Sequence, residues 1–248
     1  MDEPLSARIS RADRTGLVEL VAGHLARLTE RDALQALRHP YASEAMIVEI
    51  VASRVLMASR GVRRLVAGHP QTPRHDALHA LDDLTWRDLM DIGREARTPP
   101  PVRQAANRRL LDAMRGMAVG EKIALARFAP PALFPALFEE EDSRVLEALL
   151  QNPRLTPEDL QRWLSTGRPA PEGLAQLAAE GRWSARPPVR SALLLHPATP
   201  RAAALSLLTS ASREELRRLT ETPGADALLA ACAAELLERS GKPVDTAS

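Results

Sequence analysis

The chain has 248 residues, of which 45% are hydrophobic and 26% are charged, and its formal net charge is +1. This composition is ordinary for a globular protein, and the small net charge gives no general attraction to nucleic acid or to an acidic membrane. Cys232 is the only cysteine, which excludes an intramolecular disulfide framework and a metal cluster held by several cysteines.

The sequence predicts an all-α protein of about sixteen short helices. Sustained alternation of apolar and polar residues, the pattern of a strand, is missing, and aromatic residues make up only 3% of the chain. The periodicity predicts helices over 15–28, 30–38, 43–53, 60–68, 73–82, 86–96, 101–115, 119–128, 131–138, 143–151, 157–165, 171–180, 187–195, 200–209, 213–220 and 224–239. Helices this short must be held by packing on their neighbours.

Helix starts are marked by capping residues. Four pairs have the spacing of a capping box, in which two side chains bond each other's backbone N–H groups: Thr29/Asp32, Thr85/Asp88, Thr156/Asp159 and Ser212/Glu215. Three Thr-Pro dipeptides, at Thr72, Thr156 and Thr199, are predicted to place an N-cap hydroxyl before a proline at the first helical position.

A short motif recurs between predicted helices. His39-Pro40, His69-Pro70 and His196-Pro197 share it with Asn152-Pro153, and apolar residues stand at the same places before and after each proline. We expect the residue before each proline to cap the preceding helix, by donating to its last carbonyls or by favouring its negative end, because Asn fills the same place without titrating.

The segments around this motif resemble a known repeat family. Val145–Leu164, VLEALLQNPRLTPEDLQRWL, is similar to the leucine-rich repeat variant unit, and so are Val62–Leu81 and Val189–Leu208. The resemblance implies a HEAT-like α-solenoid of stacked helices. We therefore predict one domain over 1–240, with an N-terminal cap at 1–38, irregular repeats over 39–240 and a flexible tail at 241–248. Some members of the family carry a cysteine-ligated iron–sulfur cluster, which a single cysteine excludes here.

Two histidines are the sharpest candidates for chemistry. His75 and His79 lie four residues apart and would share one helix face, as metal ligands do. However, Asp76 stands where a zinc-protease motif has Glu, and the spacing offers no third ligand. A metal-dependent hydrolase is therefore the weakest hypothesis, and no cofactor is expected.

The leading prediction is a non-enzymatic scaffold that binds a protein or peptide. Solenoids expose extended surfaces, and Trp and Arg dominate the energetics of interfaces. The candidate anchors are Trp163, Arg103, Arg108, Arg186 and Arg190. The alternative is a nucleic-acid binder, possibly a divergent DNA glycosylase-like enzyme, which needs the arginine clusters aligned on one face.

The amino-terminal segment has no basic head followed by an apolar run, and the chain contains no apolar stretch of about 18 residues. We expect a cytoplasmic protein without a membrane anchor. The oligomeric state is left open.

Overall fold

The computed structural model describes residues 3–239. These residues form nineteen α-helices and two short 3₁₀ helices, and they contain no strand. The chain divides into two compact units, Met1–Ala118 and Val119–Ser248. The predicted single domain over 1–240 stays a prediction, and the predicted tail at 241–248 lies outside the described residues.

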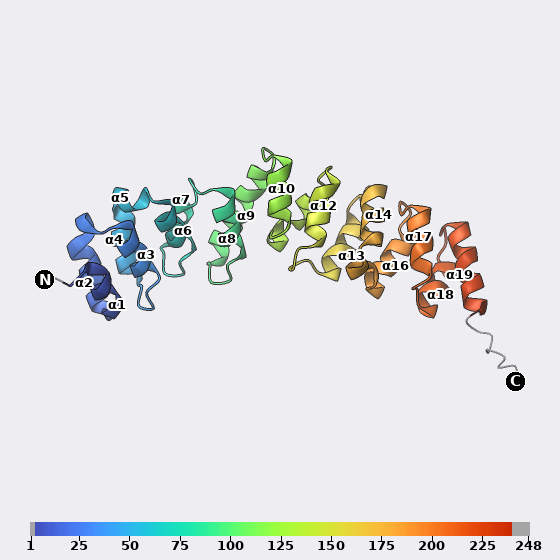
Figure 1. Ribbon diagram of the computed structural model, residues 1–248, viewed down its shortest axis with the longest axis horizontal. Coiled ribbons are helices and arrows are strands. Elements are labelled where there is room, and N and C mark those ends of the chain that lie inside the picture. Colours follow the sequence, from blue (N-terminus) through green and yellow to red (C-terminus); the bar gives the residue numbers. More distant parts are fainter. Residues whose placement is uncertain (1–2, 240–248) are drawn as a thin grey trace, which may run out of the picture. The chain divides into compact units, whose positions relative to one another are not determined.

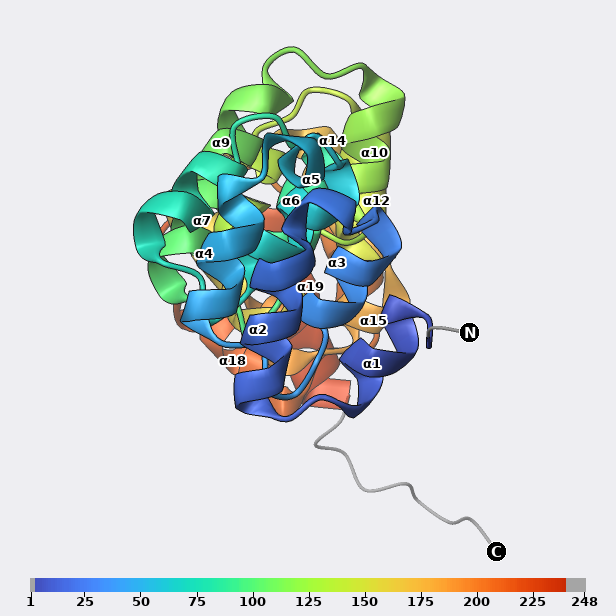
Figure 2. The same ribbon diagram turned by 90° about the vertical axis from the view of Figure 1, so that its left-hand side faces the viewer.

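The first unit consists of nine α-helices, which follow one another in chain order (Figure 1). They are α1 (Leu5–Arg11), α2 (Arg14–His24), α3 (Glu30–Leu37), α4 (Glu44–Ala52), α5 (Arg54–Met57), α6 (Arg60–Gly68), α7 (Arg74–Ala80), α8 (Trp86–Arg94) and α9 (Pro100–Met114), with the 3₁₀ helix η1 (Leu25–Arg27) after α2. Figure 2 looks onto the end of this unit where α1, α2, α3 and α4 lie in front. Its core contains fully buried Ile50, Val66 and Leu110.

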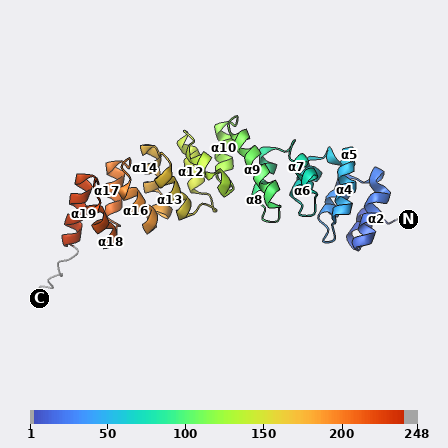
Figure 3. The same cartoon turned by 180° about the vertical axis from the view of Figure 1, so that it is seen from behind.

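The second unit consists of ten α-helices, seen from the other side in Figure 3. They are α10 (Val119–Ala126), α11 (Phe134–Phe138), α12 (Ser143–Leu150), α13 (Pro157–Thr166), α14 (Pro171–Ala179), α15 (Gly181–Ser184), α16 (Pro187–Leu195), α17 (Arg201–Leu208), α18 (Arg213–Glu221) and α19 (Ala227–Arg239), with the 3₁₀ helix η2 (Pro131–Leu133) before α11. Leu137, Leu149 and Leu193 are fully buried in its core.

The two units repeat the same series of helices. Seven successive helices of the first unit, α3 to α9, begin 127 positions before α13 to α19, respectively. The helices α4, α5, α6 and α8 also end 127 positions before α14, α15, α16 and α18. One-turn helices such as α5 and α15 have no strong signal of their own, so their recurrence at the same offset indicates a tandem duplication rather than chance.

The packing repeats as well. In the first unit α3 packs on α6, α6 on α7 and α8, and α8 on α9; in the second unit α13, α16, α17, α18 and α19 make the corresponding contacts. Buried positions match across the offset, for example Val62 with Val189, Leu56 with Trp183 and Ala106 with Ala233. The helix α10 has no counterpart in the described part of the first unit.

All sixteen predicted helices are present, and three further helices were not predicted: α1, α5 and α15. The last two have four residues each, which is too short for a period of 3.6 residues to appear in the sequence. Thus the prediction of an all-α chain is confirmed, and the predicted number of helices was too low.

The four predicted capping boxes are confirmed, at the starts of α3, α8, α13 and α18. Of the three Thr-Pro sites, only Thr156 is an N-cap. Thr72 and Thr199 were wrongly predicted, because α7 and α17 begin one residue later and Pro73 and Pro200 take the N-cap position. Both threonine hydroxyls instead donate to a carbonyl of the preceding helix, at Val66 and Leu193, over 2.7 Å.

Candidate functional site

The His-Pro motif forms the same turn wherever it occurs. Nδ1 of His39, His69 and His196 accepts a hydrogen bond from the backbone N–H two residues later, over 3.1–3.2 Å. The Oδ1 atom of Asn152 accepts the corresponding bond over 2.8 Å. The backbone carbonyl of each of these residues also accepts from the N–H three residues later.

The histidines therefore have a structural hydrogen bond, as expected, but with a different partner. The rings accept from the turn that follows and do not donate to the helix that precedes. An accepting Nδ1 fixes the neutral tautomer with its proton on Nε2. Consistent with this, burial lowers the pKa of His69 and of His196 below the ordinary value.

Two of these turns line a cleft of about 560 Å³ in the first unit, which we call the basic cleft. Its walls come from the start of α2, the carboxyl ends of α3, α6 and α8, and the loops that follow them. The residues that line it are Arg14, Leu37, Arg38, His39, Pro40, Ala42, Arg64, Leu65, Gly68, His69, Pro70, Gln71, Asp91, Ile92, Glu95, Arg97 and Thr98.

Four arginines but only two acids line the basic cleft. Arg64 is paired with one of the acids, Asp91, over 3.1 Å. The other acid, Glu95, accepts from the backbone N–H of Arg97 over 3.2 Å. Within residues 3–239, the guanidinium groups of Arg14, Arg38 and Arg97 make no ion pair, and all three residues are exposed. The cleft therefore carries uncompensated positive charge.

A buried hydroxyl lies against the same cleft. Thr98 is 1% exposed, and its Oγ1 atom has no hydrogen-bond partner among the described residues. It lies 3.5 Å from the place where a Cβ on Gly68 would stand. An unsatisfied buried hydroxyl costs about 1–3 kcal/mol and calls for a water or a ligand to explain it.

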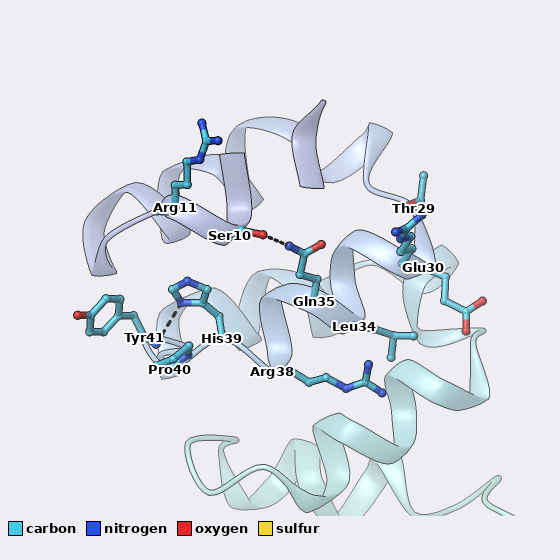
Figure 4. A pocket seen from close by; sticks show the side chains of 12 residues that line it. Ser10, Arg11, Thr29, Glu30, Leu34, Gln35, Arg38, His39, Pro40 and Tyr41 are labelled. Atoms are coloured by element: carbon cyan, nitrogen blue, oxygen red, sulfur yellow. Dashed lines mark hydrogen bonds between the residues drawn. The ribbon is translucent and has the colours of Figure 1, made fainter. Parts of the chain in front are cut away.

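A second groove lies beside the basic cleft, between α1 and α3 (Figure 4), and shares Arg38, His39 and Pro40 with it. Gln35 crosses this groove and donates to the Ser6 carbonyl over 2.8 Å and to the Ser10 hydroxyl. These hydrogen bonds join α1 to α3 across the groove.

The predicted anchor Trp163 lies inside the second unit. It is 5% exposed, and its ring stacks on Phe138 with the ring centroids 4.5 Å apart. Both rings line a cavity of about 270 Å³ together with Arg162 and Gly167. At 5% exposure Trp163 itself offers little surface to a partner, whereas Phe138 is half-buried.

Two of the four predicted arginine anchors belong to the first unit and two to the second. Arg103 donates to the carbonyls of Ala96 and Thr98, both at 3.5 Å, while Arg108 is exposed on α9. Arg186 is an exposed residue before α16, and neither it nor Arg190 lines the cavity beside Trp163. The predicted binding role of all five residues stays a prediction.

Arg190 is buried and paired with Glu215 on α18 over 2.8 Å. Burial alone would raise the pKa of this carboxyl, but hydrogen bonds from Arg190, Ser212 and Ser191 outweigh it and lower the pKa to about 2. The first unit joins the same two helices differently: Asp88, the counterpart of Glu215, binds Arg60 over 2.6 Å.

The histidines of α7 do not form a ligand set with other residues. The rings of His75 and His79 are stacked with their centroids 6.5 Å apart, and Nδ1 of His79 lies 2.8 Å from a carboxylate oxygen of Asp82. Over residues 3–239, no group of three or more His, Cys, Asp or Glu side chains is placed to hold a metal ion.

The sequence groups arginines at 63–64, 103–115, 182–190 and 213–218, and several of these residues are paired inside the chain. Arg63 binds Asp83, Arg109 binds Asp82 and Arg218 binds Glu214. Of the four arginines that line the basic cleft, only Arg64 belongs to a cluster in the sequence, beside Arg63. Arg14, Arg38 and Arg97 are far apart along the chain and come from three different elements, so no local pattern brings them together.

None of the helices described is both long enough and apolar enough to cross a membrane. The chain matched no protein-family model, no curated protein and no solved structure.

Proposed function

We propose that the chain is a non-enzymatic docking module with a HEAT-like α-solenoid fold, and that it binds a protein or peptide in the basic cleft. The fold assignment rests on the resemblance to leucine-rich repeat variant units and on short helices that pack in series within each unit. Docking is supported by the open, polar cleft, since recognition sites are concave and contain a few directed polar groups.

The main support for the basic cleft as the binding site is a glycine that keeps it open. Gly68, which lines the cleft, corresponds to Leu195 in the second unit, although α6 and α16 match at both ends. Glycine is a poor helix former, and Leu195 indicates that this fold accepts a large side chain here. The glycine of the first unit therefore keeps space open that the fold itself does not require.

Replacing Gly68 with Leu tests this proposal. A Cβ at this position meets only ordinary contacts, 3.5 Å from Thr98 and 3.9 Å from Ile92, so the Gly68→Leu variant should fold. Gly120→Leu is the matched control, because a Cβ on that glycine of the second unit meets nothing within 4 Å.

The experiment is affinity capture from nuclease-treated lysate of the native cell, with quantitative mass spectrometry of the captured proteins. We expect the wild type and Gly120→Leu to recover the same protein, and Gly68→Leu to recover about tenfold less. Equal recovery by Gly68→Leu would place the binding site elsewhere. Enrichment that appears only without nuclease would favour the alternative, a nucleic-acid binder.

A further inference from the structure

The charge of the basic cleft points to the chemistry of its ligand, and this step rests on the proposed docking function. Arg14, Arg38 and Arg97 are exposed cations without an ion-pair partner among the described residues. They lie on three separate elements: the start of α2, the end of α3 and the loop after α8. Cations spread in this way suit several anions along an extended chain better than one compact anion.

The second unit has no cations at the corresponding positions. The residues 127 positions after Arg14, Arg38 and Arg97 are Glu141, Ser165 and Gly224. Arg64 likewise corresponds to Ser191. Arg64 lies within α6, which matches α16 at both ends, so this part of the framework stands with Ser191 in its place. Arg14, Arg38 and Arg97 lie outside the helices that match at both ends, and there the comparison shows only that the second unit has no cation at the same offset. Their exposure and their lack of an ion-pair partner among the described residues leave them available to a ligand.

The lining favours carboxylates over a nucleic-acid backbone. Asp91 and Glu95 interrupt the basic surface and would repel a continuous row of phosphates. No Phe, Tyr or Trp lines the cleft, so bases would find no aromatic ring on which to stack. Arginine pairs with a carboxylate through two parallel hydrogen bonds. The flexible side chains of a peptide can direct their carboxylates to the arginines and away from the two acids of the cleft.

Neutral polar groups in the same cleft suit the backbone of a peptide. The Thr98 hydroxyl is buried and has no partner among the described residues. His69 uses Nδ1 to accept from Gln71, which leaves the Nε2–H group as a donor. A peptide supplies both carbonyls and N–H groups for such partners.

We infer that the basic cleft binds an extended peptide segment that carries several Asp or Glu side chains, with Arg14, Arg38 and Arg97 pairing with its carboxylates. The probe is a fluorescently labelled oligoglutamate of about twelve residues, which spans roughly 40 Å when extended. Oligoglutamine of the same length is the neutral control, and a single-stranded oligonucleotide tests the alternative polyanion. Binding to the full chain is measured by fluorescence polarisation at low salt.

The decisive variant carries the residues of the second unit: Arg38→Ser and Arg97→Gly, together with Arg14→Ser. The matched control, Arg127→Ser, Arg168→Ser and Arg217→Ser, removes the same charge from positions of the second unit. We expect oligoglutamate to bind more tightly than oligoglutamine, and the cleft variant to bind it about tenfold more weakly than the control variant does.

Three outcomes would overturn the inference: equal loss in both triple variants, equal binding of the two peptides, or tighter cleft-dependent binding of the oligonucleotide. These failures can be separated from failure of the docking proposal. If Gly68→Leu still abolishes capture of the cellular protein while oligoglutamate shows no preference, the cleft is a docking site for a ligand of different chemistry.

Discussion

Single glycines in the second unit should respond in opposite ways to the same substitution. A Cβ on Gly167 would lie 2.6 Å from the carbonyl oxygen of Trp163, a contact that only a backbone shift can relieve. Gly120 lies within α10 with open space around it. We expect Gly167→Ala to lower the free energy of unfolding by about 1–3 kcal/mol, and Gly120→Ala to raise it by about 0.5–1 kcal/mol. Urea unfolding measures both, and a neutral Gly167→Ala would show that the α13 terminus relaxes easily.

The half-buried histidines His69 and His196 should make stability fall as the medium becomes acidic. The pKa of His69 and of His196 is lowered from the ordinary 6.5 by burial. Below that pH the unfolded chain therefore binds protons that the folded chain does not, and the free energy of unfolding decreases as pH falls.

Replacing both histidines with Asn should remove this part of the pH dependence. Asn152 shows that an amide oxygen can accept the same bond in this turn. We expect His69→Asn/His196→Asn to have about the wild-type Tm near pH 7.5 and to lose less Tm between about pH 7 and pH 5, as measured by circular dichroism. Parallel pH profiles for the two proteins would count against this explanation.

Sequence reasoning at the residue scale worked where both partners are close in the chain. The capping boxes, such as Thr29 with Asp32, need only neighbouring residues of one helix, and they were predicted correctly. Thr72 and His69 also have partners that are close in the chain. Thr72 donates to a carbonyl of the preceding helix, and His69 accepts from an N–H of the turn that follows. Which of the two groups a side chain reaches depends on the path of the turn, which the sequence does not show. The surroundings of Arg14, Arg38 and Arg97 depend on tertiary packing, which no local pattern specifies.

Ion pairs join the corresponding helices of the two units: Arg60–Asp88 and Arg64–Asp91 in the first, and Arg190–Glu215, which is buried, in the second. Arg190 and Glu215 have side-chain exposures of 8% and 5%. Arg190→Ala would leave the Glu215 carboxylate without its cation, and we expect the free energy of unfolding to fall by about 3–5 kcal/mol. The double variant Arg190→Met/Glu215→Leu removes both charges and should lose less. If the single and double variants lose equal stability, packing rather than charge dominates this contact.

The same pair predicts behaviour in acid. Because the pKa of Glu215 is lowered to about 2 from 4.5, its contribution is complete above about pH 4.5 and disappears as pH falls towards 2. Arg190→Met/Glu215→Leu should therefore show a shallower loss of stability over this range than the wild type, which thermal unfolding at several pH values can measure.

Helix positions were predicted well, but the larger repeat was not. The prolines of the motif lie 30, 83 and 44 residues apart, which favours units of one helix pair. His69 and His196 are themselves 127 residues apart, and ten of the twenty residues of Val62–Leu81 recur at this offset in Val189–Leu208. Identical residues are sparser elsewhere, so the full extent of the repeat becomes clear only when the helix boundaries are compared.

For the whole molecule, the duplication predicts two independently folding halves. Met1–Ala118 and Val119–Ser248 are compact units, each with its own buried core and each of ordinary domain size. Expressed separately, both fragments should have helical circular dichroism spectra and cooperative thermal transitions. A fragment that unfolds without cooperativity would show that its core depends on the other half.

The separated halves should also divide the binding activity unequally. If both halves fold, the duplicated framework suffices for structure. The cleft at Gly68, and the arginines that have no ion-pair partner within residues 3–239, belong to the first half. In the second half Leu195 and Ser165 stand in the places of Gly68 and Arg38. We therefore expect the fragment 1–118 to bind oligoglutamate with about the affinity of the full chain, and the fragment 119–248 to bind it no better than oligoglutamine. Comparable binding by both folded fragments would mean that the shared helical framework, rather than the residues that distinguish the first unit, recognises the ligand.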